Sequence, residues 1–279
     1  DMEATLDGEP LKPWSSFTVQ PGSVLNFGFA QTGCRAYLSV HGGFDVPIVL
    51  GSRATHTRSR VGGLQGRILR DGDEIAFGSV KTTELTNCEL PHSLKQSYHT
   101  EISVRVILGP QQESFTAAGI ATLFNAQYTL TAEADRMGYR LEGAPIEHSG
   151  SADIVSDALC QGAIQVPAHG RPIIMMSDRQ TTGGYTKIGT VITADLALLA
   201  QAKPGDKIRF VATDDETAVK AIIARNKYLS QLTEFVRSNS EERKKTVAAI
   251  AGAIVSRQNI KVYKISFNGK SFVAEVAEK

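Results

Sequence analysis

Residues 162–195 read GAIQVPAHGRPIIMMSDRQTTGGYTKIGTVITAD, and the unusual residues of the chain are concentrated there. The apolar run from Pro172 to Met176 predicts a buried strand, and a polar, glycine-bearing loop from Ser177 to Tyr185 follows it. Loops held by a rigid strand are frequent sites of binding and catalysis, because the scaffold fixes them while their backbone donors remain free. A polar turn between two barrel strands is the structural alternative for the same pattern.

The composition excludes several classes of protein. The 279 residues carry a formal net charge of +1, with 42% hydrophobic and 21% charged residues. These values are typical of globular proteins and disfavour disorder, collagen and coiled coil. No dense basic patch is present, so we expect no nucleic-acid partner. The apolar run at 247–255 is too short to cross a bilayer and no signal peptide is found, so we expect a cytoplasmic protein without a membrane partner.

Cysteine and histidine spacings disfavour a disulfide framework and a metal site. The chain has three cysteines, Cys34, Cys88 and Cys160. None belongs to a C-x-x-C pair, which favours a reducing compartment and a packing role for each. The six histidines lack metal-binding spacing, and His148 is expected in an exposed loop beside Glu147 and Ser149. Residues 184–190 have the glycine spacing of a P-loop but lack the lysine after the second glycine, so they are not expected to bind a triphosphate.

A turn followed by a strand recurs at residues 21–27, 71–77 and 204–210, which is typical of β-barrel units. We therefore expect residues 1–80 to form a first β-barrel subdomain, and we expect part of it to precede Asp1. Its expected strands are Ser16–Val19, Val24–Phe27, Arg35–Val40 and Glu74–Phe77. The glycine-rich span 42–67 is either a set of tight barrel turns or a surface for a flat ligand or partner.

Residues 81–98 are polar and contain a proline, which predicts a linker before a second β-barrel subdomain at 99–213. The elements expected in it are strands at Ile102–Leu108, Tyr128–Thr131 and Ile154–Ala158, helices at Gln112–Asn125 and Val191–Ala200, and a charged loop at Asp135–Gly143. Beyond it we expect a helical extension at 214–259, with one amphipathic helix at Asp215–Arg237 and a second from Ser240. Alternating residues around Asn268-Gly269 predict a terminal β-hairpin at 260–279.

Three ordered motifs carry a family resemblance. They are QVPAHGRPIIMMSDRQTTGGYTKIGTVITADLALLAQAKPGDKIRF at 165–210, DRMGYRLEG at 135–143, and YLSVHGGFDVP at 37–47 with LGSR at 50–53. Together they resemble the carboxyltransferase-type domain of urea carboxylase (urea amidolyase), allophanate hydrolase subunit 2 and the 5-oxoprolinase C subunit. Two positions depart from the family pattern: Ala134 stands for the usual serine and Thr186 for the usual proline.

The resemblance implies a mainly β fold with minor α, in which two cyclophilin-like β-barrel subdomains flank a cleft. It also implies enzymes that move carboxylate from biotin to a urea-like nitrogen, or that open a lactam ring using ATP. The terminal hairpin resembles the first strands of a biotinyl carrier domain. The expected cofactors are therefore biotin, on a carrier domain or partner chain, and ATP used by a partner subunit. The expected partners are a sister subunit or domain, the biotinyl carrier domain and a small amide or urea-like substrate.

The resemblance and the polar loop together define the candidate site. The catalytic candidates are Asp178, Arg179, Gln180, Thr181 and Thr182. The candidates for binding substrate or biotin are Gly183, Gly184, Tyr185, Lys187, Gln165, Asp135, Arg136, Arg140, Ser52 and Arg53. In this hypothesis Arg179 holds a carboxylate, Asp178 orients an acceptor N–H, and the backbone at 182–184 donates hydrogen bonds.

Alternatives remain open both for the charged loop and for the function of the whole chain. For the charged loop, an ion pair that pins two strands is as good an interpretation as catalysis. For the whole chain, a carboxyltransferase competes with a 5-oxoprolinase subunit and with a non-catalytic regulatory module that binds a sister subunit.

Overall fold

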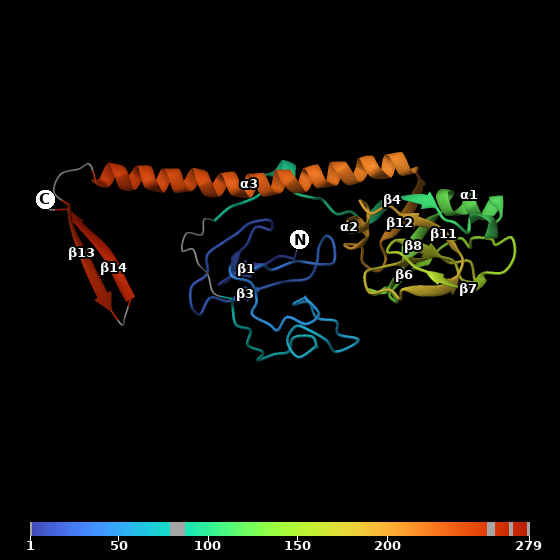
Figure 1. Ribbon diagram of the computed structural model, residues 1–279, viewed down its shortest axis with the longest axis horizontal. Helices are drawn as coiled ribbons and strands as arrows, with labels where there is room; N and C mark the ends of the chain where they lie inside the picture. The colour runs from blue at the N-terminus through green and yellow to red at the C-terminus, as the bar shows by residue number, and fades with distance from the viewer. Residues whose placement is uncertain (1, 79–86, 256–259, 268–269, 278–279) are drawn as a thin grey trace.

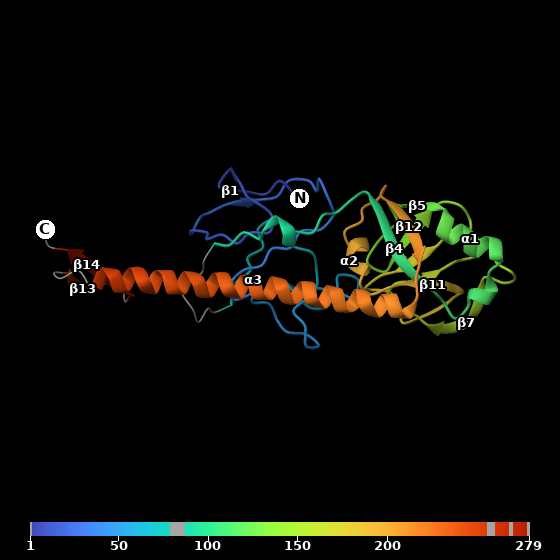
Figure 2. The same cartoon turned by 90° about the horizontal axis from the view of Figure 1, so that it is seen from above.

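The computed structural model describes residues 2–78, 87–255, 260–267 and 270–277, and from residue 240 onward it describes the backbone alone. A β-barrel lies at one end of the molecule, and residues 2–78 lie beside it in the middle (Figure 1). The long helix α3, Asp215–Val255, starts at the barrel and runs past the middle region toward a hairpin at the other end. The perpendicular view shows the same order of parts (Figure 2).

Seven strands close into the barrel. They are β4 (Glu101–Leu108), β5 (Gln127–Leu130), β6 (Gly138–Glu142), β8 (Ala163–Gln165), β9 (Ile173–Met175), β11 (Lys187–Val191) and β12 (Lys207–Ala212). Their order is β11-β4-β12-β5-β6-β9-β8, and β8 pairs with β11 to close the circle. Strands β4 and β12 run parallel, whereas the other neighbours are antiparallel. The predicted β fold of 99–213 is therefore confirmed as a closed barrel.

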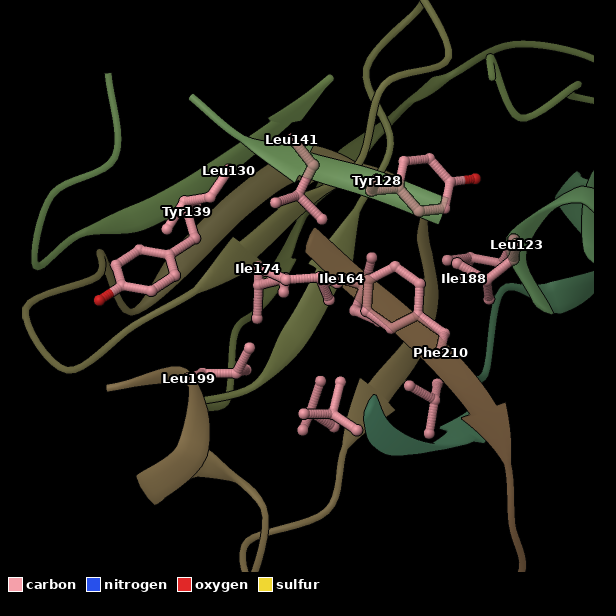
Figure 3. Packing of buried hydrophobic residues seen from close by; sticks show 14 of the residues in the cluster. Leu123, Tyr128, Leu130, Tyr139, Leu141, Ile164, Ile174, Ile188, Leu199 and Phe210 are labelled. Carbon is pink, nitrogen blue, oxygen red and sulfur yellow. The ribbon is translucent and has the colours of Figure 1, made fainter. Parts of the chain in front are cut away.

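Alternation of apolar and polar residues places the barrel core. In β4 the side chains of Ile102, Val104 and Val106 are buried, while the intervening residues face outward, as the two-residue period of a strand requires. Figure 3 shows such side chains meeting inside the barrel, where the rings of Tyr128 and Phe210 lie 5.6 Å apart. Burying a side chain of this size contributes about 1.5–3 kcal/mol, so the core holds the barrel strands that carry the candidate site.

Short helical segments lie outside the barrel strands, and two of them differ in their bounds from the predicted helices. They are the 3₁₀ turns η1 (His92–Leu94) and η2 (Gln112–Ser114) and the α-helices α1 (Ala117–Asn125) and α2 (Leu196–Leu199). The helix predicted from Gln112 begins at Ala117, because the Thr116 hydroxyl caps it by accepting from Gly119 N at 2.9 Å. The helix predicted from Val191 is only α2, since Val191 still pairs with β4.

The two helices predicted after residue 214 are one helix, α3, so that prediction was wrong. The first helix was expected to end at Arg237 and the second to start at Ser240. Instead the Ser238 hydroxyl and the Asn239 amide each donate to Phe235 O at 3.1 Å, which satisfies a carbonyl inside the helix. Tyr228 fixes α3 to the predicted linker, where its hydroxyl donates to Leu94 O at 2.7 Å.

Residues 2–78 contain little regular strand. The strands are β1 (Thr5–Leu6), β2 (Glu9–Pro10) and β3 (Leu25–Asn26), in the order β2-β1-β3. Of the four strands predicted here, only Val24–Phe27 overlaps one of them. Arg35–Val40 has no strand partner in the described residues, and the backbone of Arg35 is bonded instead to the side-chain amide of Gln201. Glu74–Phe77 has one isolated bridge, between Phe77 and Phe44.

Two further strand pairs lie outside the barrel. Strand β10 (Thr182–Tyr185) pairs with β7 (Asp153–Ala158), so the second half of the predicted polar loop is a strand. Likewise, the second half of the predicted charged loop is β6. The terminal hairpin is confirmed as β13 (Ile260–Phe267) and β14 (Lys270–Ala277), while its predicted turn at 268–269 lies outside the described residues.

Candidate functional site

Asp178 and Arg136 form an ion pair that joins two of the sequence motifs. Asp178 N donates to Arg136 O at 2.8 Å, and in return Arg136 Nε and Nη2 donate to the two carboxylate oxygens at 2.7 and 2.8 Å. These hydrogen bonds hold the pKa of Asp178 below its ordinary value. The Asp178 side chain is 22% exposed and that of Arg136 is 64% exposed, so the pair is accessible to a ligand.

His56 reaches the same pair from residues 2–78, and no sequence pattern pointed to it. Its Nε2 lies 4.0 Å from Asp178 Oδ2. The positive charge that His56 can carry adds a smaller lowering of the Asp178 pKa. The polar cluster of Asp178, Arg136 and His56 therefore lies where the N-terminal region meets the barrel.

Arg179 is engaged by the protein itself. Its Nε donates to Leu159 O at 3.1 Å, and its Nη1 lies 3.5 Å from Met176 O. The guanidinium thus connects the segment before β8 with the end of β9. This geometry indicates a structural contribution from Arg179, whereas the sequence-based hypothesis was that Arg179 holds a carboxylate.

Strand β10 packs tightly on Gln165 through Gly183. A Cβ atom on Gly183 would lie 2.6 Å from Gln165 Nε2 and 2.7 Å from Leu159 Cδ1. Gln165 is only 2% exposed, and its amide donates to Tyr185 O at 3.3 Å. The side chain of Gln165 is therefore occupied in holding β10 against the barrel.

Lys187 forms a second polar cluster at the far end of β10. Its side chain is 8% exposed, and its Nζ donates to Asp157 Oδ2 at 2.8 Å. Gln111 bonds both partners, because its Nε2 donates to Asp157 Oδ2 at 3.2 Å and its Oε1 accepts from Lys187 N at 3.1 Å. The contact with Lys187 lowers the pKa of Asp157. Neither Asp157 nor Gln111 was predicted: Asp157 is placed by the pairing of β10 with β7, and Gln111 lies just before η2.

Other predicted residues lie apart from these clusters. Asp135 accepts from the backbone N–H groups of residues 137 and 138, which shapes the turn before β6. Arg140 pairs with Glu133 at 3.5 Å on the exposed side of that strand. Ser52 and Arg53 bond within their own segment: Ser52 Oγ accepts from the N–H of residue 54, and Arg53 Nη1 lies 3.2 Å from the carboxylate of residue 45. Gln180, Thr181, Thr182 and Tyr185 are exposed.

A hollow on the barrel contains none of the predicted site residues. It is an open groove of about 480 Å³, lined by 145–148, 150, 152 and 168–170. His148 lies in it half-buried, with Nε2 3.0 Å from Val166 O and 3.2 Å from Thr186 Oγ1, while Glu147 and Ser149 of the predicted exposed loop are exposed. The packing role predicted for the cysteines is also wrong for Cys160, which is exposed.

The N-terminal region is fastened to the barrel near the Asp178 cluster. The Gln201 Oε1 atom accepts from Cys34 N at 3.1 Å and from Arg35 N at 3.0 Å, and its Nε2 donates to Arg35 O at 3.1 Å. The Arg35 guanidinium donates to Tyr139 OH at 3.1 Å and also to Ala200 O. These bonds fix the position from which His56 approaches the barrel.

Two further features of the chain concern a metal-binding site and a membrane-spanning helix. Within the described ranges, no three histidine, cysteine or acidic side chains are grouped so that they could bind a metal ion. Across those same ranges, no helix combines the length and apolar character needed to cross a membrane.

Comparison with known proteins places this geometry in a family. The family described as carboxyltransferase domain, subdomain A and B, matches residues 1–212. The 5-oxoprolinase C subunit of Escherichia coli is 36% identical over 230 residues, which cover 82% of this chain and 73% of that protein. The urea amidolyase of Saccharomyces cerevisiae is 32% identical over 234 residues, which are 77% of this chain and 12% of that much longer protein. The crystal structure of Kluyveromyces lactis urea carboxylase is similar with a TM-score of 0.73 and 29% identity, over 81% of this chain and 22% of the other.

Proposed function

The chain belongs to the carboxyltransferase domain family with subdomains A and B, and from that premise we propose that it is the carboxyltransferase component of a biotin-dependent carboxylase. The acceptor in this proposal is a urea-like or amide nitrogen. The observation that carries it is the pair of Asp178 and Arg136, because this pair unites two of the motifs that define the resemblance. Similarity to urea carboxylase supports the choice of reaction.

The residues of the Asp178 cluster suit the acceptor side of the reaction. The Asp178 carboxylate keeps lone pairs free beside its two bonds to Arg136, so it can accept from an acceptor N–H and orient the nitrogen. The exposed Arg136 guanidinium suits planar recognition of the transferred carboxylate better than Arg179, whose donors face backbone carbonyls. We therefore assign the carboxylate-holding role to Arg136.

Strand β10 offers donors that fit a ureido group. In the described part of the chain β10 has β7 as its strand neighbour on one edge, so N–H groups on its other edge point away from that partner. At Gly184 an added Cβ would make ordinary van der Waals contacts with β7, at 3.6 Å from Ile154 O and 3.9 Å from Ser156 Oγ. When bound, carboxybiotin supplies the carboxyl group for transfer. The free N–H groups of β10 and the exposed Thr181 hydroxyl would hold the ureido oxygen and stabilise the charge that develops on it.

The C-terminal part supports delivery of biotin by a carrier. Helix α3 has 41 residues and so spans about 60 Å at 1.5 Å per residue. The β13–β14 hairpin follows it in the sequence, and this hairpin resembles the first strands of a biotinyl carrier domain. In this proposal α3 is a rigid spacer between the barrel and the carrier.

The test is acceptor-dependent decarboxylation of free carboxybiotin by the purified chain, with urea, guanidine-like compounds, short amides and 5-oxoproline as acceptors. We expect at least one acceptor to accelerate the release of CO₂, and Arg136→Ala to abolish the acceleration. The control is Arg171→Ala, since Arg171 is similarly exposed but pairs with Glu142 at 3.0 Å. Failure of every acceptor with the wild-type chain would overturn the proposal.

A second candidate function is a 5-oxoprolinase subunit that opens a lactam with ATP and partner subunits. It is favoured by the 36% identity to the E. coli 5-oxoprolinase protein over 73% of that protein's length. ATP-dependent loss of 5-oxoproline, seen only when partner subunits are added, would support this candidate. A regulatory module that binds a sister subunit is the outcome if neither reaction occurs but a partner is bound.

A further inference from the structure

The turn that carries His56 is shaped by three glycines. A Cβ atom on Gly62 would collide with Ala54 O, one on Gly63 with Thr55 Oγ1, and one on Gly66 with Arg60 O. These three glycines therefore allow close backbone packing in the turn, whereas an added Cβ on Gly43 or Gly51 in the same glycine-rich span would meet nothing within 4 Å. Such packing holds residues 54–60 in one conformation.

Hydrogen bonds within the turn fix both the backbone and the ring of His56. The backbones of His56 and Val61 bond each other in both directions, at 2.8 and 3.2 Å. Ser59 N donates to His56 Nδ1 at 3.2 Å. In the neutral ring the proton must then be on Nε2, which is the atom 4.0 Å from Asp178 Oδ2. His56 thus presents an N–H donor beside a carboxylate acceptor.

We propose that His56 Nε2–H and the Asp178 carboxylate together bind the amide edge of the acceptor, which makes His56 a specificity-determining residue. This inference rests on the proposed function and deepens it. In urea and in a lactam, an N–H and the C=O point in the same direction, so one can donate to Asp178 while the other accepts from His56. The separation of 4.0 Å is too long for a direct hydrogen bond between His56 and Asp178, and it leaves these groups available to bridge a ligand.

The chemistry of this pair defines what it accepts and rejects. A primary amide, a urea or a lactam satisfies both groups. A tertiary amide has no N–H and leaves the Asp178 carboxylate unpaired, whereas a ligand that turns a carboxylate instead of an amide edge toward Asp178 is repelled by it. The side chains of His56 and Asp178 are 43% and 22% exposed, so a small molecule can reach both.

Two substitutions separate a donor role from a structural role of His56. His56→Gln retains an N–H donor near the position of Nε2, whereas His56→Asn retains only an acceptor near Nδ1 for the Ser59 N–H. The full chain is titrated with urea and with 5-oxoproline at millimolar concentrations, and binding is followed by NMR. The same variants are assayed for acceptor-dependent decarboxylation of carboxybiotin. The control is His169→Gln, because His169 Nδ1 also accepts a local N–H, from Arg171 at 3.1 Å, but lies in the separate groove.

We expect His56→Asn to weaken binding of at least one probe by about three- to tenfold, as loss of one hydrogen bond predicts, and His56→Gln to stay within about threefold of wild type. N,N-Dimethylacetamide should not compete with either probe. Loss in His56→Gln with retention in His56→Asn would assign a structural role and overturn the inference, as would binding of neither probe to wild type. If a probe binds with this pattern but no acceptor is carboxylated, the inference stands and the carboxyltransferase proposal fails.

Discussion

Replacing Gly62 with alanine tests whether close packing of the turn at residues 54–66 holds His56 in its position beside Asp178. Gly62 has φ of +72°, and an added Cβ would also collide with the backbone oxygen of Ala54. The matched control is Gly72→Ala, because Gly72 has φ of +83° but no atom within 4 Å of an added Cβ. Gly72→Ala therefore measures the cost of the left-handed backbone conformation without the cost of a steric collision.

The expected magnitudes follow from these two effects. An L-residue in the left-handed region costs about 1–2 kcal/mol, and the restricted unfolded chain returns about 0.4–1 kcal/mol, so Gly72→Ala should cost about 1 kcal/mol. A forced backbone shift adds about 1–3 kcal/mol, so Gly62→Ala should cost about 2–4 kcal/mol in total. The larger cost should be local to the turn that contains His56.

Chemical denaturation gives the free energy of unfolding, and amide hydrogen exchange at residues 54–67 shows whether the loss is local. We expect exchange in this segment to rise strongly in Gly62→Ala and little in Gly72→Ala. Acceptor binding should weaken only in Gly62→Ala. Equal costs for the two variants, or unchanged exchange at 54–67, would refute the packing argument.

Three further predictions concern β10, a surface turn and a buried carboxylate. Gly183→Ala should destabilise the chain by about 1–3 kcal/mol because the new methyl group displaces buried neighbours. The control Gly184→Ala should change the free energy of unfolding by no more than about 0.5 kcal/mol. Equal melting temperatures of the two variants in thermal denaturation would contradict the argument. The Arg67 contact lowers the pKa of Asp73 from 3.8 to about 2, so this carboxylate stabilises the fold above pH 3.8 and the stabilisation disappears as pH falls toward 2. The free energy of unfolding, measured by denaturation at several pH values across that range, should depend less on pH in Asp73→Asn than in the wild-type chain. The same dependence on pH in both proteins would count against the Arg67–Asp73 pair. Asp195→Ala should lower the free energy of unfolding by about 3–5 kcal/mol, because the buried carboxylate accepts three hydrogen bonds from Arg105. An unchanged midpoint of urea denaturation would disprove this.

Local patterns were sufficient to predict much of the barrel. The alternation at Ile102–Leu108 and the apolar run at 172–176 depend only on neighbours in sequence, and both became barrel strands. The terminal hairpin was predicted for the same reason, since paired alternation around a tight turn is a local signal. In contrast, the second helix predicted from Ser240 does not exist as a separate element, because Ser238 and Asn239 bond back into α3 and the helix continues.

The candidate site was predictable only in part, because its partners come from distant segments. The motifs around 136 and 178 were both singled out, but nothing in either motif indicated that these two side chains pair with each other. His56 carried no signal because its contact depends on how residues 2–78 are placed against the barrel by Gln201 and Arg35. Asp157 was hidden for a similar reason, since the partner of a buried lysine is fixed by strand pairing and not by spacing.

The stretch from Asp178 to Lys187 therefore combines two chemically different ends. At one end Asp178 is partly exposed, keeps free lone pairs and meets His56, so it can exchange its partners for a ligand. At the other end Lys187 is 8% exposed and fully engaged by Asp157, so releasing it would leave a buried charge unpaired. A ligand that displaced Lys187 would have to offset that cost, whereas one that binds Asp178 would not. The physical asymmetry thus favours acceptor binding at the Asp178 end and a structural role for the Lys187 end.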